Sequence, residues 1–167
     1  MIKGSNSCVL QLGSNMNDRQ GLLEEARVYI QSSVGEILEK SSLYESEPWG
    51  NPELNWFLNQ VVIINSPHSP IEVLRLCKKI EQSMGRSAKR GLDYENRVID
   101  IDILFYNDEV ISEPDLKVPH EKIPQRRFVL EPLVELIPQF VHPVLNLSLL
   151  HLLDICEDSL VVKSLGY

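Results

Sequence analysis

Two aspartates interrupt an apolar run near the middle of the chain, and their spacing restricts how that run can fold. Asp100 and Asp102 lie two residues apart within residues 97–105. Successive side chains of a β-strand point to opposite faces, so the two aspartates share one face with Val98 and Leu104. The other face then consists of Ile99, Ile101, Ile103 and Phe105. The run therefore predicts a strand with one buried face and one face that carries a carboxylate pair.

This carboxylate pair is suited to a hard divalent cation, and magnesium is the first to consider. Two residues of strand rise separate its members by roughly 6 to 7 Å at the backbone, and hard cations take oxygen ligands. Adjacent carboxylates repel each other unless positive groups lie nearby. Arg97 precedes the strand, and residues 85–91 contain three further cations, among them Arg86. A metal-polyphosphate ligand needs carboxylates for the metal and guanidinium groups for the phosphate oxygens. The alternative interpretation is a solvated ion cluster that only offsets the charge of the pair.

Length and composition predict one domain that spans residues 1–167 and has a core of its own. The chain has 167 residues, of which 43% are hydrophobic, and nothing in it suggests a second domain. Its formal net charge of -8 argues against a general nucleic-acid binder, because affinity for phosphate backbones needs a basic surface. The N-terminus has no apolar core of signal-peptide length, and no later apolar stretch is long enough to span a membrane. We therefore expect a cytoplasmic monomer that binds neither nucleic acid nor membrane.

Motifs for several other kinds of site are absent. Cys8, Cys77 and Cys156 are widely spaced and form no Cys-x-x-Cys motif, so reduced buried thiols are expected instead of a disulfide framework or a zinc site. The chain also lacks a Walker motif and Gly-x-Gly-x-x-Gly, so side-chain cations would have to bind any phosphate.

The hydrophobic pattern predicts the element order strand, helix, strand, strand, helix, strand. The expected strands are residues 8–12, 37–44, 56–64 and 98–105; the expected helices run from Asn17 or Asp18 to Gly35 and over residues 70–84, 128–137 and 147–156. This order is typical of an α+β, ferredoxin-like split βαβ fold, in which helices pack on one face of a mainly antiparallel sheet. The other face would stay free, and there the acid pair and the loops at 45–55 and 112–127 would gather around a ligand.

Several polar and aromatic residues are further candidates for a binding site. His120 and Arg126 lie in a proline-punctuated loop and both donate hydrogen bonds to anions, although a loop histidine is usually a surface residue. Trp49 lies in a Pro-Gly loop and is the least core-like of the aromatics, which by default pack in cores. Asn59 lies in an apolar strand, where its amide either binds the edge of a flat heterocycle or pairs with neighbouring backbone.

Several short segments together match a known family almost from end to end. They are residues 12–15, 41–50, 57–59, 85–86, 97–104 and 118–120, together with Glu81, Arg126 and Phe128. With these segments the chain resembles the 6-hydroxymethyl-7,8-dihydropterin pyrophosphokinases of folate biosynthesis, and their combination is specific although each alone is weak. The resemblance implies transfer of a pyrophosphoryl group from ATP to the hydroxymethyl oxygen of the dihydropterin, with release of AMP.

The resemblance also implies roles for individual residues. Two magnesium ions would be held by Asp100 and Asp102, and Arg86 and Arg97 would bind the phosphates as catalytic residues. The positions that match ATP contacts are Glu81, Arg86, Arg97, Ile103, His120 and Arg126. The positions that match pterin contacts are Ser46, Glu47, Trp49, Phe57, Asn59 and Phe128. The chain departs from the best-known members at Phe57, where they have tyrosine, and at Ala88, where they have a second arginine.

Two other functions are compatible with parts of the pattern. A glycoside hydrolase would use Asp100 and Asp102 as acid and base, which explains the acids but not the arginines. A non-catalytic nucleotide or pterin sensor would keep the pocket and lack turnover. Dependence on magnesium and formation of AMP would distinguish the kinase from both.

Overall fold

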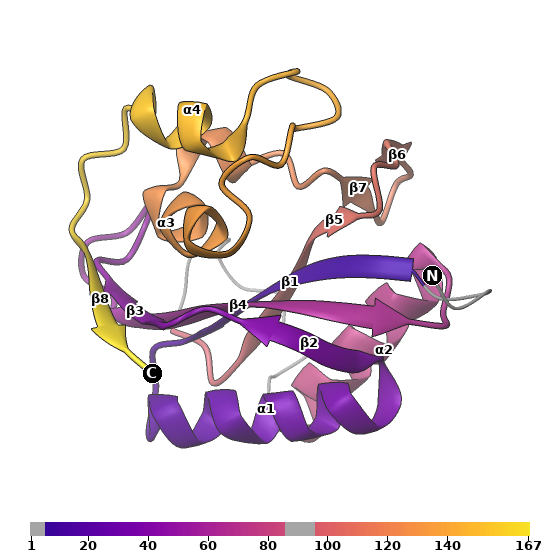
Figure 1. Cartoon of the computed structure of the whole chain (residues 1–167). Helices are drawn as coiled ribbons and strands as arrows, with labels where there is room; N and C mark the ends of the chain where they lie inside the picture. The colour runs from indigo at the N-terminus through magenta and orange to yellow at the C-terminus, as the bar shows by residue number, and fades with distance from the viewer. Residues whose placement is uncertain (1–5, 86–95) are drawn as a thin grey trace.

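An antiparallel sheet organises the part of the chain that the computed structural model describes, residues 6–85 and 96–167 (Figure 1). The strands are β1 (Asn6–Ser14), β2 (Glu36–Lys40), β3 (Leu43–Ser46), β4 (Phe57–Ser66), β5 (Asp100–Tyr106), β6 (Ile111–Ser112), β7 (Lys117–Val118) and β8 (Val162–Gly166). The helices are α1 (Arg19–Ser33), α2 (Pro70–Ser83), the 3-10 turn η1 (Ile123–Gln125), α3 (Arg127–Leu136) and α4 (Leu149–Asp154). This arrangement confirms the predicted α+β fold.

Strand β4 lies at the centre of the main sheet and holds its neighbours together. The strand order is β5-β1-β4-β3-β8, and β2 also pairs with β4. The expected single strand at 37–44 is two strands, because Ser41 and Ser42 interrupt it. The Ser41 hydroxyl accepts the backbone N–H of Val61 at 3.0 Å, so a side chain takes the place of a ladder partner at this point.

The predicted starts of α1 and α2 are confirmed by their caps. The Asp18 carboxylate accepts the backbone N–H of Gly21, and the Ser69 hydroxyl accepts that of Glu72. Each cap satisfies one of the N–H groups that have no partner in the first turn of a helix. Pro70 follows Ser69 at the first helical position, where its missing N–H costs nothing.

Helices cover both faces of the sheet, so the expectation of one free face is wrong in part. Figure 1 shows α1 and α2 on one side of the sheet and α3 and α4 on the other. The reason is that β1 and β4 are apolar on both faces: Leu10 belongs to the core under α1 and α2, whereas Val9, Val61 and Ile63 belong to the core under α3 and α4. Apolar side chains on both faces need a layer on each.

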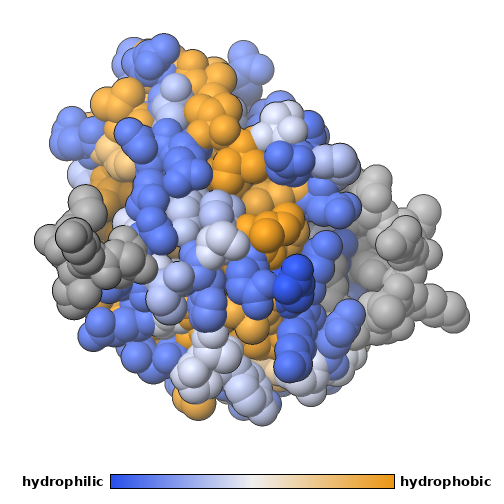
Figure 2. Space-filling model, turned by 90° about the vertical axis from the view of Figure 1, so that its right-hand side faces the viewer, coloured by the Kyte–Doolittle hydropathy of each residue, from blue (hydrophilic) through white to orange (hydrophobic). Residues whose placement is uncertain are grey.

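The layer of α3 and α4 is short and leaves apolar side chains at the surface. Figure 2 shows hydrophobic side chains gathered toward the top of the view, on the side of the sheet where these two helices lie. The exposed large hydrophobic residues in this part of the chain are Val141, Val144, Leu145, Leu150 and Ile155. Within residues 6–85 and 96–167, no helix has both the length and the apolar character needed to cross a bilayer.

A β-bulge in β5 breaks the alternation that the sequence predicts after Ile103. Val9 pairs with Phe105 and Leu10 with Ile103, so Leu104 has no opposite residue on β1. Leu104 and Phe105 therefore both join the core under α3 and α4, and the prediction that Phe105 shares a face with Ile103 is wrong. Upstream of the bulge the alternation holds, and Ile101 is buried on the face opposite the two aspartates.

The C-terminal strand β8 was not predicted. It pairs with β3 at the edge of the sheet, and most of its side chains are exposed, so it carries no periodic apolar signal. The cysteines agree with the prediction of free thiols: Cys8 and Cys77 are buried and Cys156 is half-buried. Burial raises the pKa of the Cys77 thiol to about 12.

Candidate active site

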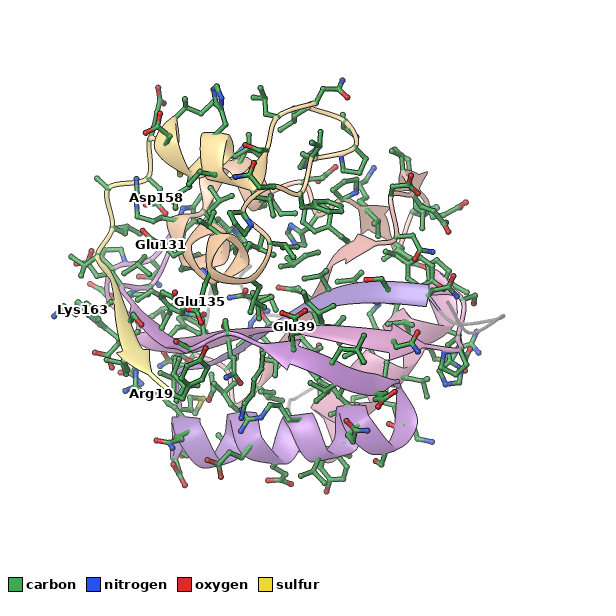
Figure 3. The ribbon with its side chains drawn as sticks, in the orientation of Figure 1. Arg19, Glu39, Glu131, Glu135, Asp158 and Lys163 are labelled. Carbon is green, nitrogen blue, oxygen red and sulfur yellow. The ribbon has the colours of Figure 1, made fainter. Side chains whose placement is uncertain are left out.

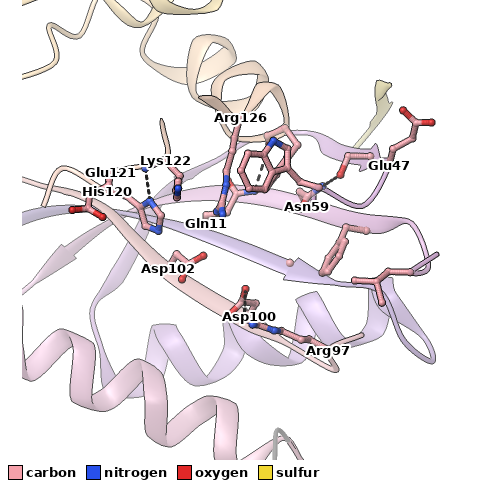
Figure 4. A pocket seen from close by; sticks show the side chains of 16 residues that line it. Gln11, Glu47, Asn59, Arg97, Asp100, Asp102, His120, Glu121, Lys122 and Arg126 are labelled. Carbon is pink, nitrogen blue, oxygen red and sulfur yellow. Dashed lines mark hydrogen bonds and ion pairs between the residues drawn. The ribbon is translucent and has the colours of Figure 1, made fainter. Parts of the chain in front are cut away.

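A pocket of about 350 Å³ lies between the sheet and the start of α3, on the face that the carboxylate pair shares. Figure 4 shows its lining side chains converging from β1, β4, β5 and the segments before α3. The residues that line it are Gln11, Gly13, Ser46, Glu47, Trp49, Leu54, Phe57, Asn59, Arg97, Asp100, Asp102, His120, Glu121, Lys122, Arg126 and Phe128. Most of the predicted site residues are therefore brought together in one pocket.

The two aspartates project from β5 into this pocket, as their spacing predicts. Asp100 and Asp102 are half-buried, and Nη1 of Arg97 lies 3.1 Å from Oδ2 of Asp100. The side chains of Arg97 and Asp100 are 19% and 23% exposed, so this ion pair is only partly screened by water. The arginine that the sequence placed beside the acids therefore does contact one of them.

Asn15, at the end of β1, fixes the backbone that carries Arg97. Its Oδ1 accepts the backbone N–H of Arg97 at 2.6 Å, and its Nδ2 donates to Oδ1 of Asn96 at 2.8 Å and to the carbonyl of Asn55 at 3.0 Å. Asn15 is 2% exposed. One buried amide thus links β1, the segment before β4 and the segment before β5 at the rim of the pocket.

His120 is held by the bulge in β5 and is neutral. Its backbone N–H donates to the carbonyl of Leu104 at 3.0 Å, which ties the loop to the irregular part of the strand. Its Nδ1 accepts the backbone N–H of Lys122 at 3.1 Å. Burial, and then the guanidinium of Arg126, lowers the pKa of His120. A neutral ring whose Nδ1 accepts must carry its proton on Nε2, so Nε2 remains a hydrogen-bond donor.

Cations and aromatic rings are interleaved on the opposite side of the pocket. The guanidinium of Arg126 lies 4.8 Å from the ring centroid of Trp49 and 5.7 Å from that of Phe128. Nζ of Lys122 lies 5.9 Å from the Trp49 centroid. These are cation–π distances, and they place Trp49 in the pocket and not in a core. Such a wall can bind a flat ring and an anionic group side by side.

Asn59 pairs with neighbouring groups, which is one of the two possibilities that its position left open; binding of a flat heterocycle by this residue stays a prediction. Its Nδ2 donates to Oγ of Ser46 at 2.8 Å and to the carbonyl of Tyr44 at 3.3 Å, while the residue also lines the pocket beside Phe57. Gly13 leaves room in front of these groups: a Cβ there would lie 3.4 Å from Oδ1 of Asn59 and 3.7 Å from Cδ1 of Phe57.

The helix α3, which brings Phe128 to the pocket, is anchored to the sheet by the side chain of Glu135. The Glu135 carboxylate accepts hydrogen bonds from the Tyr44 hydroxyl and from the backbone N–H and hydroxyl of Ser42. Burial would raise the pKa of Glu135, but these hydrogen bonds outweigh it and lower the pKa. Figure 3 shows Glu131 and Glu135 along α3, with Asp158 beside the start of the helix.

The start of α3 and the segment before β4 are each held by an arginine. The backbone N–H of Arg127 donates to Asp158 at 2.9 Å, and its Nε donates to the Asp158 carbonyl at 3.0 Å. Arg19, at the start of α1, lies 2.7 Å from Glu45 and donates to the carbonyl of Trp56 at 3.1 Å. Both walls of the pocket are therefore tied to elements outside it.

Three predicted ATP contacts are not among the residues that line this pocket. Glu81 and Ile103 are 5% and 4% exposed and lie on the side of α1 and α2, where the Glu81 carboxylate accepts the backbone N–H of Ile101 at 3.3 Å. Arg86 lies outside the described residues. The nucleotide roles of these three residues stay predictions.

Sequence reasoning did not single out Gln11, although it lines the pocket. Gln11 is 4% exposed in β1, where Val9 precedes it on the same face and belongs to the apolar core. A polar residue in an otherwise apolar strand was the available signal. Lys122, which faces Trp49, carried no such signal because charged loop residues are common.

The donor set of the pocket fits magnesium bound together with a polyphosphate. Among the described residues, no group of three or more histidine, cysteine, aspartate or glutamate side chains is arranged to hold a metal ion. Two carboxylates on one strand face are nevertheless enough for magnesium, which usually keeps several waters and shares its remaining positions with substrate phosphates.

Comparison with known proteins identifies the family. Residues 9–138 match the family model of 7,8-dihydro-6-hydroxymethylpterin-pyrophosphokinase. The 2-amino-4-hydroxy-6-hydroxymethyldihydropteridine pyrophosphokinase of Porphyromonas gingivalis is 41% identical over 136 residues, which cover 80% of this chain and 92% of that protein. The enzyme of the same name from Bacillus subtilis is 37% identical over 136 residues, covering 81% of this chain and 80% of that protein.

A solved structure shows the same fold. The crystal structure of Plasmodium falciparum HPPK-DHPS A437G with pteroate superposes with a TM-score of 0.72 at 20% identity, over 92% of this chain and 41% of that longer one. By its sequence and by its fold, the chain belongs to the 7,8-dihydro-6-hydroxymethylpterin-pyrophosphokinase family, the pyrophosphokinases of folate synthesis.

Proposed function

We propose that this chain transfers the pyrophosphoryl group of ATP to 6-hydroxymethyl-7,8-dihydropterin and releases AMP. One observation carries the proposal: a single pocket combines a carboxylate pair and cations with aromatic rings and a buried amide. The first set suits a metal-bound polyphosphate and the second suits a flat heterocycle. Both halves of a kinase complex can therefore be bound within reach of each other.

The carboxylates of Asp100 and Asp102 are the proposed ligands of two magnesium ions. When bound, magnesium would neutralise phosphate charge and favour attack at phosphorus. Arg97, held by Asn15 and paired with Asp100, is the proposed phosphate clamp at this end. His120 and Arg126 would donate to the nucleotide phosphates, and the neutral His120 would do so through Nε2.

The aromatic side of the pocket is the proposed site of the pterin. Phe57 and Phe128 would stack on the flat ring, and Asn59 and the segment with Ser46, Glu47 and Trp49 would bind its edge. The hydroxymethyl oxygen would form a bond to the β-phosphorus while the bond from that phosphorus to the oxygen bridging the α-phosphorus breaks. AMP would leave with that oxygen, and one proton would be released.

The experiment that tests this proposal measures products with the full chain, ATP, magnesium and the dihydropterin. We expect AMP to form only when both substrates are present, to stop with EDTA and to return with added magnesium. Formation of ADP in place of AMP would contradict the reaction, and binding of both ligands without turnover would identify a sensor. Glycoside hydrolysis is not favoured, because it leaves the cations around the acid pair unexplained.

Three broader features belong to the same proposal. We expect residues 1–167 to act as one domain, as a monomer, and in the cytoplasm. A single cooperative unfolding transition would support the first, size-exclusion chromatography with light scattering would test the second, and fractionation of cells that express the tagged chain would test the third. A stable dimer or a membrane-bound pool would require these features to be revised, without altering the proposed reaction.

A further inference from the structure

Gln11 brings a buried hydrogen-bond acceptor without a partner into the pocket. The residue is 4% exposed. Its Nε2 makes a long contact of 3.5 Å with the carbonyl of Phe128, and its Oε1 has no partner among the described residues. The carbonyl of Phe128 can only accept, so the amide must turn its N–H side toward Phe128. The oxygen is thereby directed away from that carbonyl.

Unmet hydrogen-bonding capacity is concentrated in this pocket. Within residues 6–85 and 96–167, the buried side-chain nitrogen and oxygen atoms without a partner are Oε1 of Gln11 and Nε of Arg126. Both residues line the pocket. A buried carbonyl that lacks a partner has lost its hydrogen bonds to water without replacement, and this cost disappears when a ligand supplies a donor. An orphan acceptor in a pocket therefore indicates a ligand that donates there.

The position of Gln11 indicates which end of the ligand it meets. Gln11 is directly opposite Asp102 in the pairing of β1 with β5, and opposite residues of adjacent strands have Cβ atoms about 4.5 to 5.5 Å apart. Figure 4 shows Gln11 between Asp102 and Arg126. Gln11 thus lies beside the proposed metal ligands, where the reacting group of the phosphoryl acceptor must be placed. Asn59 lies further from them, because it is on β4 opposite Gly13, two residues after Gln11.

We propose that Oε1 of Gln11 accepts a hydrogen bond from the hydroxyl group of the phosphoryl-accepting substrate. This inference rests on the proposed function and adds a positioning residue to it. A hydroxyl that donates to Gln11 has its rotation restricted, so that its oxygen lone pairs are left for phosphorus. Gln11 then selects ligands that carry a hydroxyl at this position over those that carry a methyl group.

The test compares two ligands and two buried glutamines. The ligands are 6-hydroxymethylpterin and 6-methylpterin, whose binding to the full chain is measured by calorimetry with magnesium and a non-hydrolysable ATP analogue. In Gln11→Met the acceptor is removed with little change of side-chain volume. The control is Gln60→Met, because Gln60 is 2% exposed but fully partnered: its Oε1 accepts from Arg27 at 2.6 Å and its Nε2 donates to the Ser41 carbonyl at 2.7 Å.

We expect the wild type to prefer the hydroxymethyl ligand by about 3- to 10-fold, the range of one neutral hydrogen bond, and Gln11→Met to lose that preference. Thermal stability of the ligand-free protein should be unchanged or higher in Gln11→Met, since an orphan acceptor has been removed, and lower in Gln60→Met. The Gln60→Met variant should keep the ligand preference.

Three results would overturn the inference. One is an unchanged ligand preference in Gln11→Met, or in Gln11→Ala if the methionine variant does not fold. Another is a loss of stability in Gln11→Met as large as that of Gln60→Met, which would make Gln11 a structural residue. The third is a wild type that does not distinguish the two ligands although it forms AMP. A wild type that forms no AMP and binds neither pterin would instead refute the proposed function.

Discussion

Replacing Gly13 by alanine should weaken binding of the pterin without destabilising the folded protein. A Cβ at this position would lie 3.4 Å from Oδ1 of Asn59 and 3.7 Å from Cδ1 of Phe57, which are ordinary van der Waals distances. The folded protein can therefore accept the methyl group without displacing its neighbours. Alanine in a strand also loses less backbone entropy on folding than glycine, an advantage of about 0.5 to 1 kcal/mol.

The same methyl group would occupy space that a stacked ring needs. This methyl group would already touch the edge of Phe57. A flat ligand on that side must therefore move away from the phenyl ring or from Asn59. One methyl group too many in a well-fitted pocket costs about 1 to 3 kcal/mol, so we expect pterin binding about 10-fold to 100-fold weaker. Binding of the ATP analogue, which the proposed site places beside the acid pair, should change little.

Gly35→Ala is the matched control for this substitution. A Cβ there would meet the backbone oxygen of Asn65 at 2.6 Å, too close for an unchanged backbone. We expect Gly35→Ala to be less stable by about 1 to 3 kcal/mol and to bind the pterin normally. Urea unfolding and pterin calorimetry on both variants provide the comparison. If Gly13→Ala bound the pterin as the wild type does, the assignment of this wall to the pterin would be refuted.

Three further predictions concern the acid pair, one buried histidine and the anchor of α3. Asp100→Ala and Asp102→Ala should each reduce AMP formation by about 10³-fold or more with a nearly unchanged melting temperature; a large drop in that temperature would indicate a structural pair. Burial lowers the pKa of His142, so the unfolded state binds more protons and stability falls as pH decreases below about 6.5. In His142→Asn, the free energy of unfolding measured with urea should change less between pH 5 and pH 7 than in the wild type. An equal change with pH in both proteins would contradict this prediction. Glu135→Gln should weaken the tie between α3 and β3 by about 1 kcal/mol or less, since Glu135 is exposed on one side; unfolding at pH 7 measures this, and an increase in stability would refute it.

Local patterns were sufficient for much of the fold and for the acidic part of the site. The capping residues Asp18 and Ser69 mark the starts of α1 and α2 because a helix cap depends on a few neighbouring residues. Alternation along β5 places Asp100 and Asp102 on one face because the strand is regular up to Ile103. The resemblance of short segments to a family then indicated the substrate, which no periodicity could have done.

Only the tertiary structure decided what lies around those residues. The bulge that moves Phe105 to the other face, the helices on the second face and the edge strand β8 all depend on pairing with residues far away in the chain. The same holds for Asn15, which joins three segments, and for Gln11, whose Nε2 faces the carbonyl of Phe128 while its Oε1 has no partner among the described residues. Periodicity reports what each residue contributes to its own strand or helix. Contacts between distant segments depend on how all the elements pack at once, so they become visible only in the folded chain.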